Sequence, residues 1–287
     1  MRGIVLMNLA MAFFTLNDTA MKAVMEVLPM MQAIGLRGLL ATLALAGIAW
    51  RMGVLLPPLA PRDRRLILWR TLAELVATLS FLAALIHMPI AEISAILQVL
   101  PLAMTLAAAL FLGERVGWRR VLAIATGFLG VLLVIRPGGE AFNIWALSGL
   151  LSVAAVVLRD LATRRLAQAV PSVFIAMVTA GAVMLMGFAG SLLGEWVTPG
   201  PREVGLILLA AAALILGLVT VVAAMRVGDV AVVSPFRYAS LLWAIVLGWL
   251  VFGHLPDALA LTGAVLIVAS GVFTLLREQK LKRARPT

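Results

Sequence analysis

Long apolar runs alternate with short polar segments along the whole chain. Each run is roughly 20 residues long, enough to cross a hydrocarbon core of about 30 Å at about 1.5 Å per residue. The sixth run has the shortest cleanly apolar part, from Leu147 to Leu158. The pattern predicts an all-α polytopic membrane protein with ten transmembrane helices. The predicted spans are residues 3–24, 30–50, 66–87, 90–112, 118–136, 144–163, 172–193, 203–225, 229–252 and 257–276.

Composition agrees with this pattern and narrows the function. Of the 287 residues, 63% are hydrophobic and 13% are charged, whereas a soluble domain has about 45–50% and about 25%. The chain has no cysteine, which excludes disulfides, thiol catalysis and thiolate metal sites. A net charge of +10 suits the basic cytoplasmic loops of a membrane protein, so no nucleic-acid partner is expected.

The distribution of basic residues among the loops predicts an orientation. With the N-terminus in the cytoplasm, 18 of the 23 Lys and Arg residues lie on cytoplasmic segments. The opposite side holds Lys22, Arg136 and Arg202, which is a strong positive-inside bias. We therefore expect a multi-pass protein of the bacterial inner membrane with both termini in the cytoplasm. The basic tail is expected to contact anionic lipid headgroups.

The two halves of the chain resemble each other. A shift of 140 residues places Ser94 on Ser234 and Gly113 on Gly253. We interpret this as a duplicated unit of five helices, and because five is odd the second unit enters the membrane from the opposite side. Inverted repeats of this kind place a substrate site near the midplane of the membrane. The predicted parts are residues 1–137 and 142–276 for the two repeats and 277–287 for the cytoplasmic tail.

Ionisable residues inside the predicted spans are the first candidates for a site, because charges in lipid are costly and mark pathways. Asp18 and Arg37 both lie about 10 Å from the outer end of their helices, and Glu74 and Arg237 about 12 Å from the inner end. Equal depth predicts an Asp18–Arg37 pair and a Glu74–Arg237 pair, in either a structural or a functional role.

The chemistry of the outer pair suits a substrate with two opposite charges. Asn17 and Asp18 suit a substrate ammonium, and the planar guanidinium of Arg37 suits a carboxylate. Arg159 and Asp160 are expected at the inner interface instead, with Asp160 paired to Arg164.

Two prolines within spans predict interrupted helices. Pro101 in the fourth span and Pro235 in the ninth remove backbone hydrogen bonds and are the predicted kinks or hinges. Polar side chains beside these prolines are expected to line a cavity, and Trp243 is a candidate for contact with an apolar substrate, lipid or a neighbouring helix. The residues predicted to bind substrate or line its pathway are Asn17, Asp18, Arg37, Glu74, Ser94, Gln98, Ser234, Arg237, Tyr238 and Trp243.

Several short motifs resemble one known family when they are taken in order. Leu36-Arg37-Gly38-Leu39-Leu40-Ala41 resembles the arginine-bearing second helix of the EamA-type branch of the drug/metabolite transporter superfamily. Further resemblances to its two repeats are found in Ala91-Glu92-Ile93-Ser94-Ala95 with Pro101, in Leu112-Gly113-Glu114-Arg115, in Thr163-Arg164-Arg165-Leu166, and from Ser234-Pro235-Phe236-Arg237-Tyr238 through Gly253-His254-Leu255-Pro256-Asp257.

The resemblance implies ten helices, a central cavity and secondary transport of metabolites without ATP. The chain looks most similar to the YddG-type amino-acid exporters, so we expect export of amino acids, possibly aromatic or other apolar ones, by alternating access. The alternative is another solute, such as a nucleoside-like, S-adenosylmethionine-like or cationic compound. An enzyme is disfavoured because G-x-S-x-G, H-E-x-x-H and Walker A motifs are absent. No cofactor or metal is expected, and a monomer and a homodimer stay open.

Overall fold

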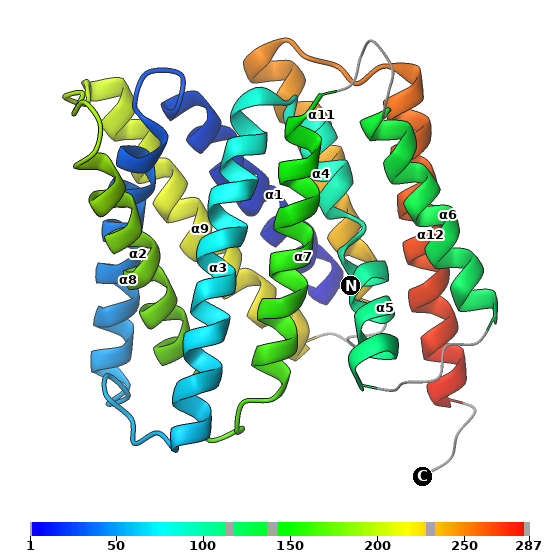
Figure 1. Ribbon diagram of the computed structural model, residues 1–287, viewed down its shortest axis with the longest axis horizontal. Helices are drawn as coiled ribbons and strands as arrows, with labels where there is room; N and C mark the ends of the chain where they lie inside the picture. Colours follow the sequence, from blue (N-terminus) through cyan, green and yellow to red (C-terminus); the bar gives the residue numbers. More distant parts are fainter. Residues whose placement is uncertain (1, 113–117, 137–142, 228–232, 284–287) are drawn as a thin grey trace.

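Helices make up all the regular secondary structure in the part of the chain that the computed structural model describes, which is residues 2–112, 118–136, 143–227 and 233–283 (Figure 1). Nine described segments are long and apolar enough to span a membrane, and Val121–Ile135 is a shorter apolar helix. The polytopic helical fold predicted from the sequence is therefore confirmed. The helices are α1 Arg2–Val24, α2 Met30–Arg51, α3 Pro61–His87, α4 Ile90–Leu97, α5 Leu100–Leu112, α6 Trp118–Ile135, α7 Trp145–Arg164, α8 Ser172–Ser191, α9 Pro201–Val227, the 3₁₀ helix η1 Ser234–Tyr238, α11 Ala239–Phe252 and α12 Ala258–Arg283.

Two helices extend beyond the apolar runs that predict them. The third begins at Pro61 rather than at residue 66, since proline suits the first helical turn and Asp63 adds favourable negative charge there. The tenth continues to Arg283, so the first residues of the predicted tail are helical. Hydropathy marks the part of a helix that crosses the hydrocarbon, whereas its polar ends depend on features such as proline and charge in the terminal turns.

The fourth and ninth spans are both interrupted close to a proline. Between α4 and α5 the α-helix breaks at Gln98 and Val99, just before Pro101. In the ninth span Pro235 lies in the first turn of η1, and α11 follows directly. Proline has no N–H to donate to the preceding turn, which explains why the regular helix fails at these two points.

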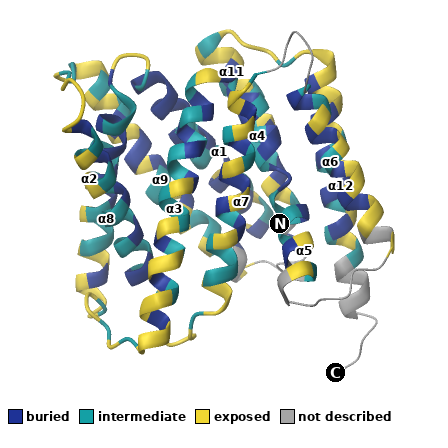
Figure 2. Cartoon of the chain, viewed as in Figure 1, coloured by how far each residue is buried: buried dark blue, intermediate teal, exposed yellow. Residues whose placement is uncertain are grey.

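The main helix pairs each join an element from before residue 137 to one from after residue 142. The most extensive contacts join α1 with α9, α2 with α8, α3 with α7 and α6 with α12, and less extensive ones join α1 with α11, α2 with α9 and α4 with α11. Loops α1–α2, α3–α4 and α8–α9 lie at one end of the bundle, called the upper end after Figure 1, and loops α2–α3 and α7–α8 lie at the lower end. Buried residues face the interior of the bundle and exposed ones lie on its outer surface (Figure 2). Many of the exposed residues are apolar, which suits contact with lipid.

Glycine allows the closest helix contacts. A Cβ atom on Gly38 of α2 would lie 2.9 Å from the Cα of Met184 in α8. In the same way, a Cβ on Gly130 of α6 would lie 2.6 Å from the carbonyl oxygen of Gly263 in α12. Without a driving force from water, helices in lipid associate through such close backbone contacts.

An ion pair joins α6 and α12 at the upper end. The guanidinium of Arg136, which has a positive φ of 51°, donates to the carboxylate of Asp257. Asp257 also caps α12 by accepting from the N–H of Ala260 at 2.8 Å. The Arg136 hydrogen bond is the main reason that the pKa of Asp257 falls to about 2. The stability that this pair contributes is thus present above about pH 4, the ordinary range for Asp, and is lost as the pH falls toward 2.

The glycine contact between α2 and α8 can be tested by substitution. Gly38→Ala is expected to lower the free energy of unfolding by about 1–3 kcal/mol, because the added methyl group overlaps the α8 backbone. Gly47→Ala is the matched control, since a Cβ on Gly47 of the same helix meets no atom within 4 Å. Unfolding in mixed micelles measures both variants, and equal stability of the two would contradict the close contact.

Candidate functional site

Six charged side chains from four helices lie close enough to interact between α1, α2, α3 and α7. Three are acidic and three are basic, so their formal charges cancel. We call this group the charge network, and its members are Asp18 on α1, Arg37 on α2, Arg70 and Glu74 on α3, and Arg159 and Asp160 on α7. Such groups are stable in a low-dielectric interior only when opposite charges neutralise one another.

Glu74 and Arg159 form the centre of the charge network. Their side chains are 22% and 26% exposed, and Nη1 of Arg159 donates to Oε2 of Glu74 at 2.9 Å. Nε of Arg159 donates to Oδ1 of the neighbouring Asp160 at 2.8 Å. The guanidinium thus holds two carboxylates at once and fixes α3 against α7.

These contacts correct two expectations from the sequence. The predicted Glu74–Arg237 pair is wrong, because Glu74 binds Arg159 and Arg237 is exposed on η1. Asp160 likewise pairs with Arg159 rather than with Arg164. Depth along a helix gives only the position of a residue across the membrane. Which residue Glu74 meets depends on which helices are neighbours, and α3 packs along α7.

Arg37 reaches Asp18 through an intervening amide. Nη1 of Arg37 donates to Oδ1 of Asn17 at 3.3 Å, and Nδ2 of Asn17 donates to Oδ1 of Asp18 at 2.9 Å. The predicted pair is therefore close and interacts electrostatically, but Asn17 bridges it. Nε of Arg37 is buried and has no hydrogen-bond partner among the described residues. A buried donor without a partner costs free energy, so an acceptor that reached this atom would be bound favourably.

Arg70 continues the charge network toward the lower end. Its Nε donates to Oγ1 of Thr163 at 3.0 Å, and its Nη1 donates to Oγ1 of Thr179 on α8. Sequence reasoning missed Arg70 and Arg159 because it assigned both to the cytoplasmic surface. The spacing of Arg70 and Glu74, four residues apart on one helix face, is the signal that could have identified the first of them.

The remaining predicted residues cluster at the two helix breaks, separate from the charge network. Nε2 of Gln98 donates to Oγ of Ser240 at 2.5 Å, and Ser240 offers its carbonyl to Thr15 of α1 at 3.4 Å. Tyr238 is buried against Gly271, and its hydroxyl has no partner in the described chain. The indole Nε1 of Trp243 donates to Asn8 at 2.8 Å, so it joins α11 to α1.

Two further predicted residues lie on the same two interrupted spans. Ser94 is partly buried on α4, and the side chain of Ser234 lies outside the described residues. α1 therefore separates two polar groups: Thr15 faces the helix breaks, while Asn17 and Asp18 face the charge network.

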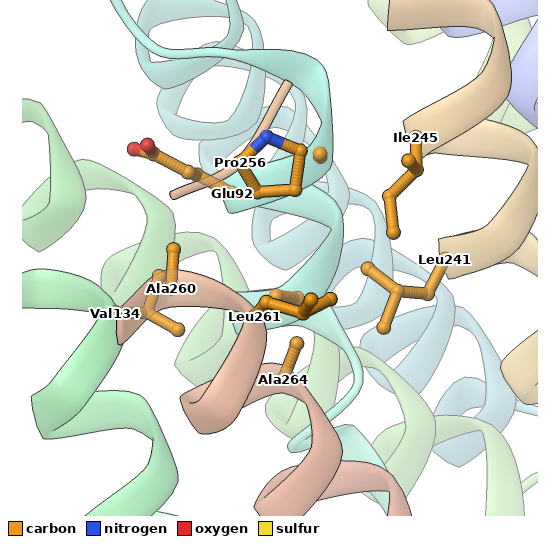
Figure 3. A pocket seen from close by; sticks show the side chains of 10 residues that line it. Glu92, Val134, Leu241, Ile245, Pro256, Ala260, Leu261 and Ala264 are labelled. Atoms are coloured by element: carbon orange, nitrogen blue, oxygen red, sulfur yellow. The ribbon is translucent and has the colours of Figure 1, made fainter. Parts of the chain in front are cut away.

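A pocket at the upper end is a poor site for a charged solute. It lies between α4, α6, α11 and α12, and among the described residues of its lining Glu92 is the only ionisable one. The carboxylate of Glu92 points away from Leu241 and Ile245 on the opposite wall (Figure 3). The charge network, which offers both signs of charge, is the better candidate.

Comparison with known proteins identifies the family. Residues 1–136 match the EamA-like transporter family. A riboflavin transporter of Rhizobium johnstonii is 30% identical over 234 residues, which cover 75% of this chain and 72% of that protein. The chain belongs to the EamA-like transporter family. It is a transporter and not an enzyme.

Other relatives in this family carry different solutes. The pseudopaline exporter CntI of Pseudomonas aeruginosa is 28% identical over 275 residues, covering 93% of this chain and 94% of that protein. An S-adenosylmethionine uptake transporter of Rickettsia conorii is 25% identical over 183 residues, covering 63% and 61%. A solved crystal structure with 19% identity matches 98% of both chains with a TM-score of 0.65, so the two chains share a fold.

The Glu74–Arg159 contact predicts a specific energetic coupling. Glu74→Gln and Arg159→Gln should each destabilise the protein, and the double variant should lose less than the sum, with a coupling of about 0.5–3 kcal/mol. The free energy of unfolding in mixed micelles measures this coupling.

Arg237→Gln combined with Glu74→Gln is the control for this cycle. Arg237 is exposed and makes no ion pair in the described part of the chain, so these two substitutions should add. Coupling of Glu74 to Arg237 rather than to Arg159 would contradict the pairing.

Proposed function

We propose that this EamA-like protein is a secondary transporter that exports amino acids, or solutes carrying the same α-amino and α-carboxylate groups. The observation that carries the proposal is the arrangement of Arg37 and Asp18 around Asn17. Arg37 has a buried donor without a partner, and Asp18 accepts from an amide rather than from a cation. Each group is therefore able to accept a partner of opposite charge.

A zwitterion fits these two groups better than a singly charged solute does. Its carboxylate would accept from the planar guanidinium of Arg37, and its ammonium would donate to the carboxylate of Asp18. The formal charges of the charge network cancel without substrate and still cancel when a zwitterion binds. A solute with a net charge would leave one buried charge unbalanced, which is costly away from water.

We infer that transport proceeds by alternating access of two inverted repeats, residues 1–137 and 142–276. The helix pairs support this arrangement. If the first helix of one repeat corresponds to the first helix of the other, the α1–α9 pair corresponds to the α3–α7 pair. The α2–α8, α4–α11 and α6–α12 pairs each correspond to themselves. Rocking of one repeat against the other would expose the site first to one side and then to the other.

Orientation follows from the positive-inside bias. We propose that the lower end, which holds the basic α2–α3 and α7–α8 loops, faces the cytoplasm of a bacterial cell. Helix α12 would carry the basic tail into contact with anionic headgroups. The charge network would then open toward the cytoplasm through Arg70.

A second candidate substrate has support from the relatives. S-adenosylmethionine, the solute named for the Rickettsia relatives, carries the same α-amino and α-carboxylate groups as a free amino acid. Its sulfonium adds a net positive charge, so it would bind here only if that charge lies outside the charge network and the surrounding helices leave room for its nucleoside. A riboflavin-like solute lacks these groups and would have to use the helix breaks instead.

Counterflow in proteoliposomes tests the proposed activity. Vesicles preloaded with an unlabelled substrate should accumulate the labelled compound transiently and saturably, and vesicles without preload should not. Apolar amino acids, aromatic ones among them, are expected to give the largest signal. If no amino acid and no S-adenosylmethionine gives counterflow with folded protein, the proposal fails.

Arg37 should distinguish a substrate-binding role from a structural one. Arg37→Lys keeps the charge but loses the planar fork, so we expect counterflow to fall at least about tenfold while the fold survives. Arg165→Lys, an exposed residue at the end of α7, is the control and should leave counterflow unchanged. Wild-type counterflow in Arg37→Lys would contradict the assignment of Arg37 to the substrate carboxylate.

A further inference from the structure

A buried lysine holds three helices together at the upper end of the bundle. Lys22 of α1 is only 9% exposed. Its Nζ donates to the carbonyl oxygens of Leu85 and Met88, the second at 2.7 Å, and lies 3.5 Å from that of Ile86. The ammonium also lies 5.6 Å from the centre of the Phe252 ring, at the end of α11.

The acceptors of Lys22 are the free carbonyls at the C-terminus of α3. The last four carbonyls of a helix have no partner within it, and they carry the negative end of the helix dipole. At this terminus Asn143 donates to the carbonyl of His87 at 2.9 Å, and Lys22 donates to the carbonyls of Leu85 and Met88. The ammonium therefore satisfies polar groups that would otherwise be buried without partners.

Lys22 binds in a way that differs from an ordinary lysine near the membrane surface. Such a side chain usually extends to place its ammonium in water. Here the ammonium turns inward, and in the described chain no carboxylate lies within ion-pair distance of it. Its hydrogen-bond and aromatic partners are carbonyl oxygens and the Phe252 ring. Glu26, four residues further along the chain, also interacts with it electrostatically. The carbonyl and aromatic partners are lost if α1, α3 and α11 separate.

We propose that Lys22 is the latch of the upper gate, holding that end of the transporter closed while the lower end is open. This rests on the alternating-access mechanism proposed above and adds a specific residue that sets its equilibrium. Opening of the upper end moves α1 away from α3 and α11. The ammonium then leaves its carbonyls and the Phe252 ring for water. The latch therefore favours the state in which the charge network is reached from the lower end.

Single cysteines can report on each gate, because the chain has no cysteine of its own. Thr19 lies three residues before Lys22 on α1, is 3% exposed, and donates only to the carbonyl of Thr15 within its own helix. Thr71 lies toward the lower end of α3, is 8% exposed, and its hydroxyl has no partner in the described chain. Thr19→Cys thus places a buried thiol near the upper end, and Thr71→Cys places one toward the lower end. Neither substitution removes a hydrogen bond between helices.

The experiment compares the rate at which a water-soluble maleimide labels each thiol in permeabilised membranes, with Lys22 and with Lys22→Met. If Lys22 is the latch, the maleimide should label Thr19→Cys about tenfold faster when Lys22 is replaced by Met. A tenfold change corresponds to about 1.4 kcal/mol in the opening equilibrium. Labelling of Thr71→Cys should not become faster, because stabilising the upper-open state closes the lower end.

Phe252→Leu provides a second variant that leaves Lys22 in place. It removes the aromatic face and should also increase the labelling rate of Thr19→Cys, by a smaller factor than Lys22→Met does. Faster labelling at both reporters would mean that Lys22 merely stabilises the fold, and it would overturn the proposal. An unchanged rate at Thr19→Cys would overturn it as well. Counterflow by the same variants is a separate readout, so failure of the latch leaves the proposed transport activity standing.

Discussion

The cost of burying charge away from water constrains this structure more than any other interaction. Three acidic and three basic side chains lie between α1, α2, α3 and α7, where each alone would be strongly unfavourable. Mutual neutralisation makes the set tolerable, and it also fixes which helices are neighbours. The same neutrality makes the set receptive to a zwitterion, because a solute with both charges can join it without leaving an unbalanced charge.

Helix packing supplies the rest of the framework. Glycines allow α2 and α8, and α6 and α12, to approach at backbone distance, so these pairs form tight contacts between the halves of the chain. The spans that contain Pro101 and Pro235 are interrupted instead, and polar side chains collect at those breaks. Firm pairs beside interrupted helices suit a transporter, which needs parts that move as units and points at which they bend.

The sequence predicted the helices well and their side-chain partners poorly, for a physical reason. Apolar runs must match the thickness of the bilayer, so the spans could be read directly, and proline chemistry located both interruptions. Ion pairs depend on which helices are neighbours, and depth alone assigned Glu74 to Arg237 when its partner is Arg159. The sequence places Lys22 among the few cations of the outer side, and the structure shows it buried against the C-terminus of α3. No pattern in the sequence places that terminus beside α1.

The central claim is that the charge network recognises both ends of a zwitterion, and competition in counterflow tests it most directly. Counterflow of a labelled, transported amino acid would be measured with three unlabelled competitors. They are the same amino acid, its methyl ester, which lacks the carboxylate, and its N-acetyl derivative, which lacks the ammonium. Recognition of both charges predicts that the free amino acid inhibits well and that both derivatives inhibit at least about tenfold more weakly. Equal inhibition by all three compounds would contradict it, because recognition would then rest on the side chain alone.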